Sequence, residues 1–342
     1  MTSPLADLGL TIPVVAAPMA GGGTTPAMVI AAHGAGGLGF LAAGYKTAEA
    51  LAGAIDTVRA AGVPFGVNVF APNPVPITPQ DYRAYRSAVQ GDADRYGLTL
   101  PDDVVDDDDH FAAKIELLLA QPVPLVSFTF GIPDPDVVAR LRRAGTIVGQ
   151  TVTSLREAAT AEAAGVDLLV LQGIGAGGHS GTLTPDRPPA DVVLADLVAE
   201  VVHGTSLPVV AAGGLATAGA VAAVLDAGAE AVAVGTVLLL SDESGASATH
   251  RAALTDPHRT ETVLTRAFTG RPARGLRNDF IERHDASAPL GYPAIHHLTS
   301  PLRKAAAAAG DADLVHLWAG TGYREARQEP TAAVMRRLAG EA

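Results

Sequence analysis

The sequence predicts an α/β fold, a (β/α)8 TIM barrel followed by a second, mainly helical domain. Eight short apolar runs recur before Ser241, and an Ala-rich stretch follows each of them. The runs are continuously apolar rather than alternating, which is typical of strands buried on both faces of a parallel sheet. Eight such units indicate a closed barrel. A doubly wound open sheet is the alternative, because periodicity does not separate the two architectures.

The eight expected strands fall within about 240 residues. They cover residues 14–18, 37–41, 65–70, 125–129, 147–151, 168–172, 209–212 and 231–234. Helix signals lie between them. Ser154 is expected to cap a helix over residues 155–164, with Glu157 at the capping-box position. Thr217 opens a further helix, and residues 136–143 place their apolar side chains on one helical face.

Residues 72–124 are more than one barrel crossover needs. This segment begins with several prolines, and we interpret it as an insertion after the third strand, an extended loop plus helices. It carries an acidic run at residues 106–109. Because adjacent acids cannot all converge on one ion, we interpret that run as a solvated turn before a helix rather than a metal site.

The domain organisation follows from these lengths. Residues 1–240 are expected to form the barrel. Residues 241–320 come after the eighth strand, so they are expected to form a helical lid or substrate domain over the C-terminal mouth, where barrel enzymes build their pocket walls. Residues 321–342 are expected to form a C-terminal helix that packs back on the barrel.

The composition excludes several functional classes. The chain has 24 Lys+Arg, 36 Asp+Glu, a formal net charge of −12 and no Cys. Without Cys there are no disulfides, thiol nucleophiles or thiolate metal sites. The acidic balance and the 4 % aromatic content argue against nucleic-acid binding, which needs clustered cations or stacking side chains.

Nothing in the sequence indicates a membrane protein or a metal enzyme. The first seven residues lack the basic and apolar regions of a signal peptide. The longest apolar run, residues 229–240, contains Glu230 and Gly235 and is too short to span a bilayer. No pair of histidines has HExxH spacing, so no metal is expected. We expect a cytoplasmic monomer or homodimer that acts on a small molecule.

Glycines follow the last two expected strands. Gly213 and Gly214 end the seventh, and Gly235 and Thr236 end the eighth. In barrels these two loops commonly bind phosphate through backbone N–H groups, and glycine lets the backbone approach closely. Ordinary tight turns are the alternative. Two matches to G-x-G-x-x-G, at 34–39 and 173–178, lack a following helix and are attributed to chance in a Gly-rich chain.

Polar side chains end two other strands. Asn68 and Gln172 follow apolar residues there, so each is either a structural amide or a contact to a flat heterocycle. His179 is the one large side chain in the Gly-rich loop 173–182, and it is either an acid/base group or a surface histidine.

A cluster of arginines lies in the expected lid domain. Arg271, Arg274 and Arg277 either attract an anion or form a solvated basic loop, and we favour the loop. Trp318 is expected to pack rather than to take part in chemistry.

Taken in order, these motifs resemble the class I bacterial nitronate monooxygenases, formerly called 2-nitropropane dioxygenases, over essentially the whole chain. The resemblance rests on residues 17–26 (APMAGGGTTP), 36–45 (GGLGFLAAGY), 65–70 (FGVNVF), 126–131 (VSFTFG), the His179 loop, 211–214 (AAGG), 235–236 (GT), 270–275 (GRPARG) and 317–320 (LWAG). Each motif alone is weak, and their common order is specific.

The resemblance implies a (β/α)8 barrel, a helical second domain and one non-covalently bound FMN. Carried onto this sequence, His179 is the catalytic residue, residues 20–22 run near the isoalloxazine ring, and the FMN-binding residues are Asn68, Gln172, Gly177, Gly214, Ala233, Val234, Gly235 and Thr236. The family oxidises alkyl nitronates, including propionate 3-nitronate, with O2 and without NAD(P)H. The products are an oxo compound plus nitrite and nitrate, which makes the reaction a detoxification.

Two other functions stay open. One is an FMN-dependent NAD(P)H reductase of a quinone or an enoyl thioester, and the other is a non-catalytic flavin- or phosphate-binding barrel. The sequence also departs from the family pattern at three positions. Ser180 stands where Arg is common, Ala233 where Gln is common and Thr321 where Gln is frequent. We expect these changes to affect the orientation of His179, one side-chain contact to the cofactor and the shape of the pocket.

Overall fold

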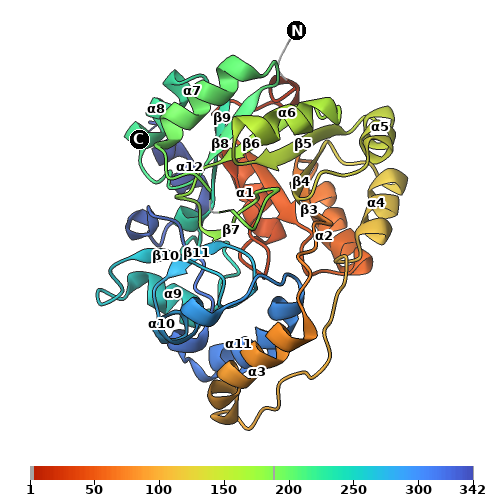
Figure 1. Ribbon diagram of the computed structural model, residues 1–342. Coiled ribbons are helices and arrows are strands. Elements are labelled where there is room, and N and C mark those ends of the chain that lie inside the picture. Colours follow the sequence, from red (N-terminus) through yellow and green to blue (C-terminus); the bar gives the residue numbers. More distant parts are fainter. Residues whose placement is uncertain (1–3, 188, 342) are drawn as a thin grey trace.

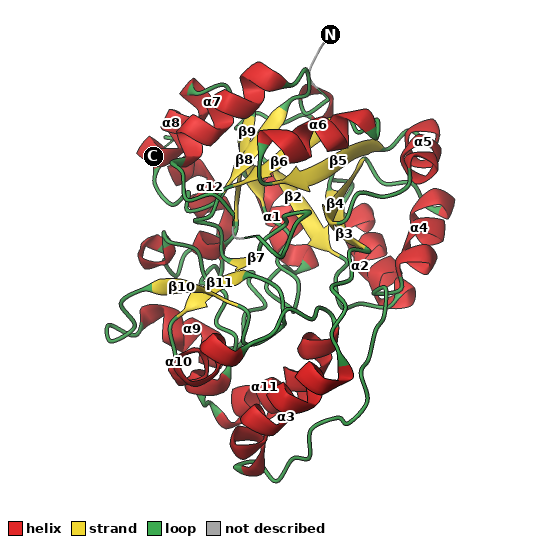
Figure 2. Ribbon diagram, in the orientation of Figure 1, coloured by secondary structure: helices red, strands yellow, loops and turns green. Residues whose placement is uncertain are grey.

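The computed structural model describes residues 4–187 and 189–341, so residues 1–3 of the expected N-terminal segment lie outside it. Its centre is a closed barrel of eight parallel strands surrounded by helices (Figures 1 and 2). The barrel strands are β1 (Val14–Ala16), β2 (Leu38–Ala42), β3 (Gly66–Ala71), β4 (Leu125–Phe130), β5 (Ile147–Val152), β6 (Leu168–Gln172), β8 (Val209–Ala212) and β9 (Ala231–Val234).

The barrel closes between its first and last strands. β1 pairs with β2 on one side, where Val15 lies opposite Leu38, and with β9 on the other, where Val14 lies opposite Val232. The expected barrel is therefore confirmed, and the open-sheet alternative is wrong. All eight expected strands are present. Each is buried on both faces of the sheet, so its sequence is continuously apolar and does not alternate between apolar and polar residues.

The helices between the strands cover the outside of the barrel. They are α1 (Pro26–Gly34), α2 (Ala48–Ala60), α4 (Phe111–Ala120), α5 (Pro135–Arg143), α6 (Leu155–Ala163), α7 (Leu194–Gly204) and α8 (Ala218–Asp226). The C-terminal helix α12 (Thr331–Leu338) packs against α1 and α8, and its Val334, Met335 and Leu338 are buried in the same core. Short 3-10 helices are η1 (Ala6–Leu8), η2 (Thr236–Leu238), η3 (Asp285–Ser287), η4 (Ala312–Leu314) and η5 (Tyr323–Glu325).

The predicted caps are present, with one difference. The Ser154 hydroxyl accepts from the Glu157 N–H, and the Thr217 hydroxyl accepts from the Ala220 N–H. In a capping box the Glu157 carboxylate would accept a hydrogen bond from the backbone N–H of Ser154, and here it does not. It accepts instead from the backbone N–H and the hydroxyl of Thr153, because it also binds the segment after β6, as described below.

A second unit, which we call the lid, lies below the barrel in Figure 1, at its C-terminal mouth. Its helices are α3 (Pro79–Asp94), α9 (Ala248–Thr255), α10 (Asp279–His284) and α11 (Ala294–Ala309), and its strands are β10 (Thr262–Thr265) and β11 (Ala273–Leu276). These strands form an antiparallel sheet with the short strand β7 (Gly178–His179) from the loop after β6. No local pattern in the sequence predicts this sheet, since β7 is only two residues long.

The insertion after β3 is divided between the two units. α3 packs along α11 of the lid (Figure 1), where the Tyr85 hydroxyl donates to Ala267 O at 2.6 Å, whereas α4 belongs to the barrel wall. We had expected the acidic run to be solvated, and this is wrong for two of its residues. Asp109 pairs at 2.7 Å with the fully buried Lys114, and Asp107 pairs at 2.8 Å with His297 on α11. The run therefore connects the barrel to the lid.

None of the helices in the described part of the chain is long and apolar enough to cross a membrane.

Candidate active site

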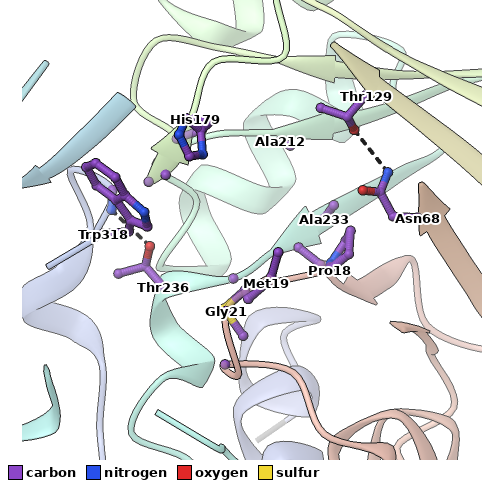
Figure 3. Close-up of a pocket in the computed structure, with 18 of the residues that line it drawn as sticks. Pro18, Met19, Gly21, Asn68, Thr129, His179, Ala212, Ala233, Thr236 and Trp318 are labelled. Atoms are coloured by element: carbon purple, nitrogen blue, oxygen red, sulfur yellow. Dashed lines mark hydrogen bonds between the residues drawn. The ribbon is translucent and has the colours of Figure 1, made fainter. Parts of the chain in front are cut away.

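A cavity of about 630 Å3 lies between the C-terminal ends of the barrel strands and the lid (Figure 3). This volume is in the range of cofactor and substrate pockets. All of the predicted site residues line it, from Asn68 on β3 to Thr236 after β9. Residues far apart in the sequence are thus brought to one place, as expected for strand ends of a barrel.

The glycines after β8 and β9 form one wall of this cavity. Gly213 and Gly214 have φ angles of 122° and 71°, which side chains rarely adopt, and a Cβ on Gly214 would lie 2.6 Å from Thr321 Oγ1. The backbone N–H groups of Gly214, Gly235 and Thr236 donate to no acceptor among the described residues. Unpaired amides beside a cavity are the donor set that a phosphate needs.

Two further residues complete this wall. The Thr236 hydroxyl accepts from the Gly320 N–H at 2.9 Å, which leaves its own proton free for a ligand. Gly177 is required by packing, since a Cβ there would lie 2.4 Å from Gly320 N. Ala233 and Val234 of β9 also line the cavity, and the small Ala233 side chain leaves room beside Pro18 (Figure 3).

The two predicted amides have different surroundings. Asn68 Nδ2 donates to Ser127 Oγ at 2.9 Å and to Thr129 Oγ1 at 3.0 Å, and its oxygen has no donor among the described residues. Gln172 is occupied by the His179 segment: it accepts from Gly181 N–H at 2.7 Å and donates to His179 O at 3.2 Å. Asn68 therefore offers an acceptor to a ligand, whereas Gln172 mainly positions β7.

His179 projects into the cavity from β7 (Figure 3). Its Nε2 lies 2.9 Å from the Thr269 hydroxyl, which also lies 3.3 Å from Arg271 O. When that hydroxyl donates to Arg271 O, Nε2 carries the ring proton and Nδ1 is a base. When it donates to Nε2 instead, Nδ1 carries the proton and is a donor. Nδ1 has no hydrogen-bond partner among the described residues, so either form presents it to a ligand.

Burial lowers the pKa of His179 to about 3, and the charges of Arg271 and Arg303 act in the same direction. The imidazole is therefore neutral near pH 7. Aromatic rings hold it in place, with centroids at 5.7 Å for Phe130, 5.7 Å for Tyr292 and 5.4 Å for Trp318. Trp318 packs, as expected, but it also lines the cavity.

The expected solvated basic loop is wrong for two of its three arginines. Arg271 is fully buried, donates to Ser180 O and Thr182 O, and lies 4.2 Å above the Phe130 ring. Arg274 donates to Ile174 O at 2.8 Å. Both thus hold the Gly-rich segment of His179 in place. Only Arg277 is a surface residue, in an exposed ion pair with Glu261.

The lid contributes residues that the sequence analysis did not single out. The Tyr45 ring, from the loop after β2, stacks on His296 of α11 with centroids 4.4 Å apart. Arg303, also on α11, lines the cavity together with Lys304 and His316. Tyr45 ends the motif at residues 36–45, but no motif marks the residues of α11. The only hint is that the lid segment is rich in histidine.

The charge of the cavity is opposite to that of the chain. Among the described residues no Asp or Glu lines it, although the protein carries a net charge of −12. Arg303 and Lys304 do line it. The described residues also contain no group of three or more His, Asp or Glu that could hold a metal. The cavity is therefore suited to anions.

A closed (β/α)8 barrel with a cofactor-sized cavity at its C-terminal mouth defines a barrel enzyme. The profile of the nitronate monooxygenase family matches residues 2–338 of the chain. The chain belongs to the nitronate monooxygenase family and is an oxidoreductase, so the non-catalytic alternative is wrong.

Similar proteins cover nearly the whole chain. A probable nitronate monooxygenase of Staphylococcus aureus strain Newman is 38 % identical over 333 residues, 96 % of this chain and 93 % of that one. A structure of nitroalkane oxidase from Streptomyces ansochromogenes is 49 % identical with a TM-score of 0.93, covering 99 % of this chain and 97 % of that one. FabK from Thermotoga maritima is 26 % identical with a TM-score of 0.76, covering 100 % and 96 %.

Proposed function

We propose that this protein oxidises alkyl nitronates with O2, using one non-covalently bound FMN, and releases an oxo compound with nitrite or nitrate. Propionate 3-nitronate is one such substrate. The observation that carries the proposal is the lining of the cavity by the described part of the chain: it contains no carboxylate, and it has unpaired backbone amides at one wall and His179 and Arg303 at the other. Membership of the nitronate monooxygenase family supports the same activity.

The described residues fit FMN. The amides of Gly214, Gly235 and Thr236 would hold its phosphate, since they have no other acceptor among the residues that the structure describes. The oxygen of Asn68 would accept a hydrogen bond from the ring system, and the small side chain of Ala233 would leave space for it. When bound, FMN supplies the redox chemistry, in that it takes electrons from the substrate and passes them to O2.

The protein's own contribution centres on His179. Its neutral ring can serve two kinds of substrate through the Thr269 hydroxyl. With Nδ1 protonated, it donates a hydrogen bond to an anionic nitronate. With Nδ1 free, it accepts the α-proton of a neutral nitroalkane. Because its pKa is lowered to about 3, His179 is a weak base, so nitronates are the better substrates.

Replacement of His179 by Asn tests this role. Flavin binding should survive, because the phosphate wall is unchanged, and turnover of nitroalkane should fall by about 100-fold or more. Absorbance of the purified protein reports bound flavin, and nitrite release reports turnover. His203→Asn, on the exposed side of α7, is the matched control. Unchanged turnover would remove His179 from its role, and a colourless protein that refuses added FMN would contradict the whole proposal.

The reductase alternative makes a different prediction. An NAD(P)H-dependent enzyme would bleach its flavin rapidly when mixed with NADH in the absence of O2, whereas a nitronate monooxygenase would not. Release of nitrite from propionate 3-nitronate without nicotinamide decides in favour of the oxidase reaction. A cytoplasmic location and a monomeric or dimeric state stay predictions from the sequence.

A further inference from the structure

Arg303 is a buried cation without a carboxylate partner among the described residues. Only 5 % of the residue is exposed, yet it lines the cavity. Nε donates to the Thr299 hydroxyl at 3.0 Å and Nη2 donates to His296 O at 2.8 Å. Nη1 lies 3.3 Å from the ring nitrogens of His316. Its hydrogen bonds are thus satisfied by neutral groups, and its charge is not compensated.

The groups around Arg303 give it no negative charge. Burial lowers the pKa of His179 to about 3, and burial also holds the pKa values of His296 and His316 well below the usual range. Burial raises the pKa of Tyr45 to about 12, so this phenol is neutral as well. An isolated charge is costly to bury, and a buried charge that lines a cavity can be compensated by an anion bound there. An anionic ligand in the cavity would supply the negative charge that Arg303 lacks.

Other lid arginines show what the structural arrangement is. Arg251 donates to the carbonyls of Leu239, Leu240 and Ser241, and it does not line the cavity. Arg259 pairs with Asp313 at 2.9 Å. Arg303 alone among these three lines the cavity and faces neutral rings.

We propose that Arg303 is the specificity-determining residue that selects anionic nitronates over neutral nitroalkanes, by supplying the fixed positive charge that faces the substrate. This inference rests on the proposed function. His179 is a weak base and therefore deprotonates neutral nitroalkanes slowly, but its neutral ring gives an anion no electrostatic advantage in binding. A guanidinium about 6 Å from a unit negative charge, at an effective dielectric constant near 20, favours the anion on the order of 100-fold.

The decisive experiment compares two substrates in two variants of the flavin-loaded enzyme. In Arg303→Met, KM for propyl-2-nitronate should rise about 100-fold, while KM for its neutral conjugate acid, 2-nitropropane, should change little. Arg303→Lys keeps the charge and should restore most of the preference. Arg251→Met removes a lid arginine that does not reach the cavity, so it should leave the ratio of the two KM values as it is. A purely structural Arg303 would raise both KM values together and overturn the inference.

A measurement on the wild-type protein keeps the test valid if Arg303→Met does not fold. Nitrate is a planar anion that resembles the nitronate group. It should bind by isothermal titration calorimetry and compete with propionate 3-nitronate. Nitrate that binds no more tightly than neutral 2-nitropropane, or no nitrate binding at all, would contradict the inference. Failure of the proposed function is distinct, because wild-type enzyme would then release no nitrite from any nitronate.

Discussion

The two walls of the cavity are built differently. The barrel wall consists of backbone amides and small side chains, such as Gly214, Gly235 and Ala233. The lid wall consists of large side chains that titrate or carry charge, such as His296, Arg303 and Trp318. A wall made of backbone keeps its hydrogen-bond donors at any pH, since amides do not ionise. A wall made of buried side chains can distinguish substrates by charge, but it depends on protonation states and on packing.

Acid should therefore damage the lid wall first, and this is the largest effect we expect. Burial lowers the pKa to about 3 for His179 and to about 4 for His250, and holds those of His296 and His316 well below their usual range. Below pH 6.5 the unfolded chain binds protons at these histidines that the folded protein does not. The free energy of unfolding is therefore highest above pH 6.5 and falls as the pH drops, by up to about 1.4 kcal/mol per pH unit for each histidine.

Urea denaturation at pH 8, 7, 6 and 5 measures this dependence. The variant His250→Gln should make the loss shallower by one proton, or about 1.4 kcal/mol per pH unit. The exposed His203→Gln variant should leave the slope near that of the wild type. A slope that does not change in His250→Gln would show that this histidine is protonated in the folded state.

Cofactor binding at the barrel wall should be lost when its backbone is distorted, because this wall carries no ionisable group. Gly214→Val places a β-branched residue at a φ of 71° and a Cβ 2.6 Å from Thr321 Oγ1, so the loop must shift and its amides turn away. FMN affinity should fall about 100-fold, a change of about 2.7 kcal/mol. Gly219→Val is the control, because Gly219 lies in α8 with nothing within 4 Å of its Cβ position. Fluorescence titration of apoprotein with FMN measures both, and equal affinities would contradict the phosphate assignment.

The same difference explains what could be predicted from the sequence. The barrel wall follows from local rules, since apolar runs predict strands and the residues after each run lie at one mouth. Asn68, Gln172 and the glycines of the last two loops were therefore found. The opposite wall combines Tyr45, from the loop after β2, with Thr269 and Arg303 of the lid, which lie far from Tyr45 in the sequence. Their burial, and hence the lowered pKa of His179, depends on tertiary packing that no local pattern encodes.

Arg271 illustrates the limit most clearly. A short segment with three arginines, Gly and Pro is typical of a solvated loop, and Arg277 behaves so. Arg271 is instead fully buried against Phe130 and binds two carbonyl groups after β7. The segment that packs against a cluster of arginines decides which of them is buried. Here that segment contains Ser180 and Thr182, which lie 91 and 89 residues before Arg271 in the sequence.

The connection between the two walls offers the smallest effect and the finest test. Glu157, on the barrel helix α6, is only 5 % exposed and accepts from the N–H groups of Thr153 at 2.6 Å and Leu183 at 2.8 Å. It also accepts from the hydroxyls of Thr153 and Thr182. In Glu157→Gln one oxygen becomes an NH2 group. Whichever oxygen is replaced, one buried backbone N–H loses its acceptor, which costs about 1–3 kcal/mol.

Chemical denaturation of Glu157→Gln should show that loss, and nitronate turnover should fall more than FMN affinity, because the displaced segment carries His179 and not the phosphate wall. Glu116→Gln is the matched control: its carboxylate is 66 % exposed in an ion pair with Arg140 at 2.9 Å, and such pairs contribute below about 1 kcal/mol. If Glu157→Gln weakened FMN binding and turnover equally, the two walls would not be separable. The segment after β6 would then serve the cofactor as much as the substrate.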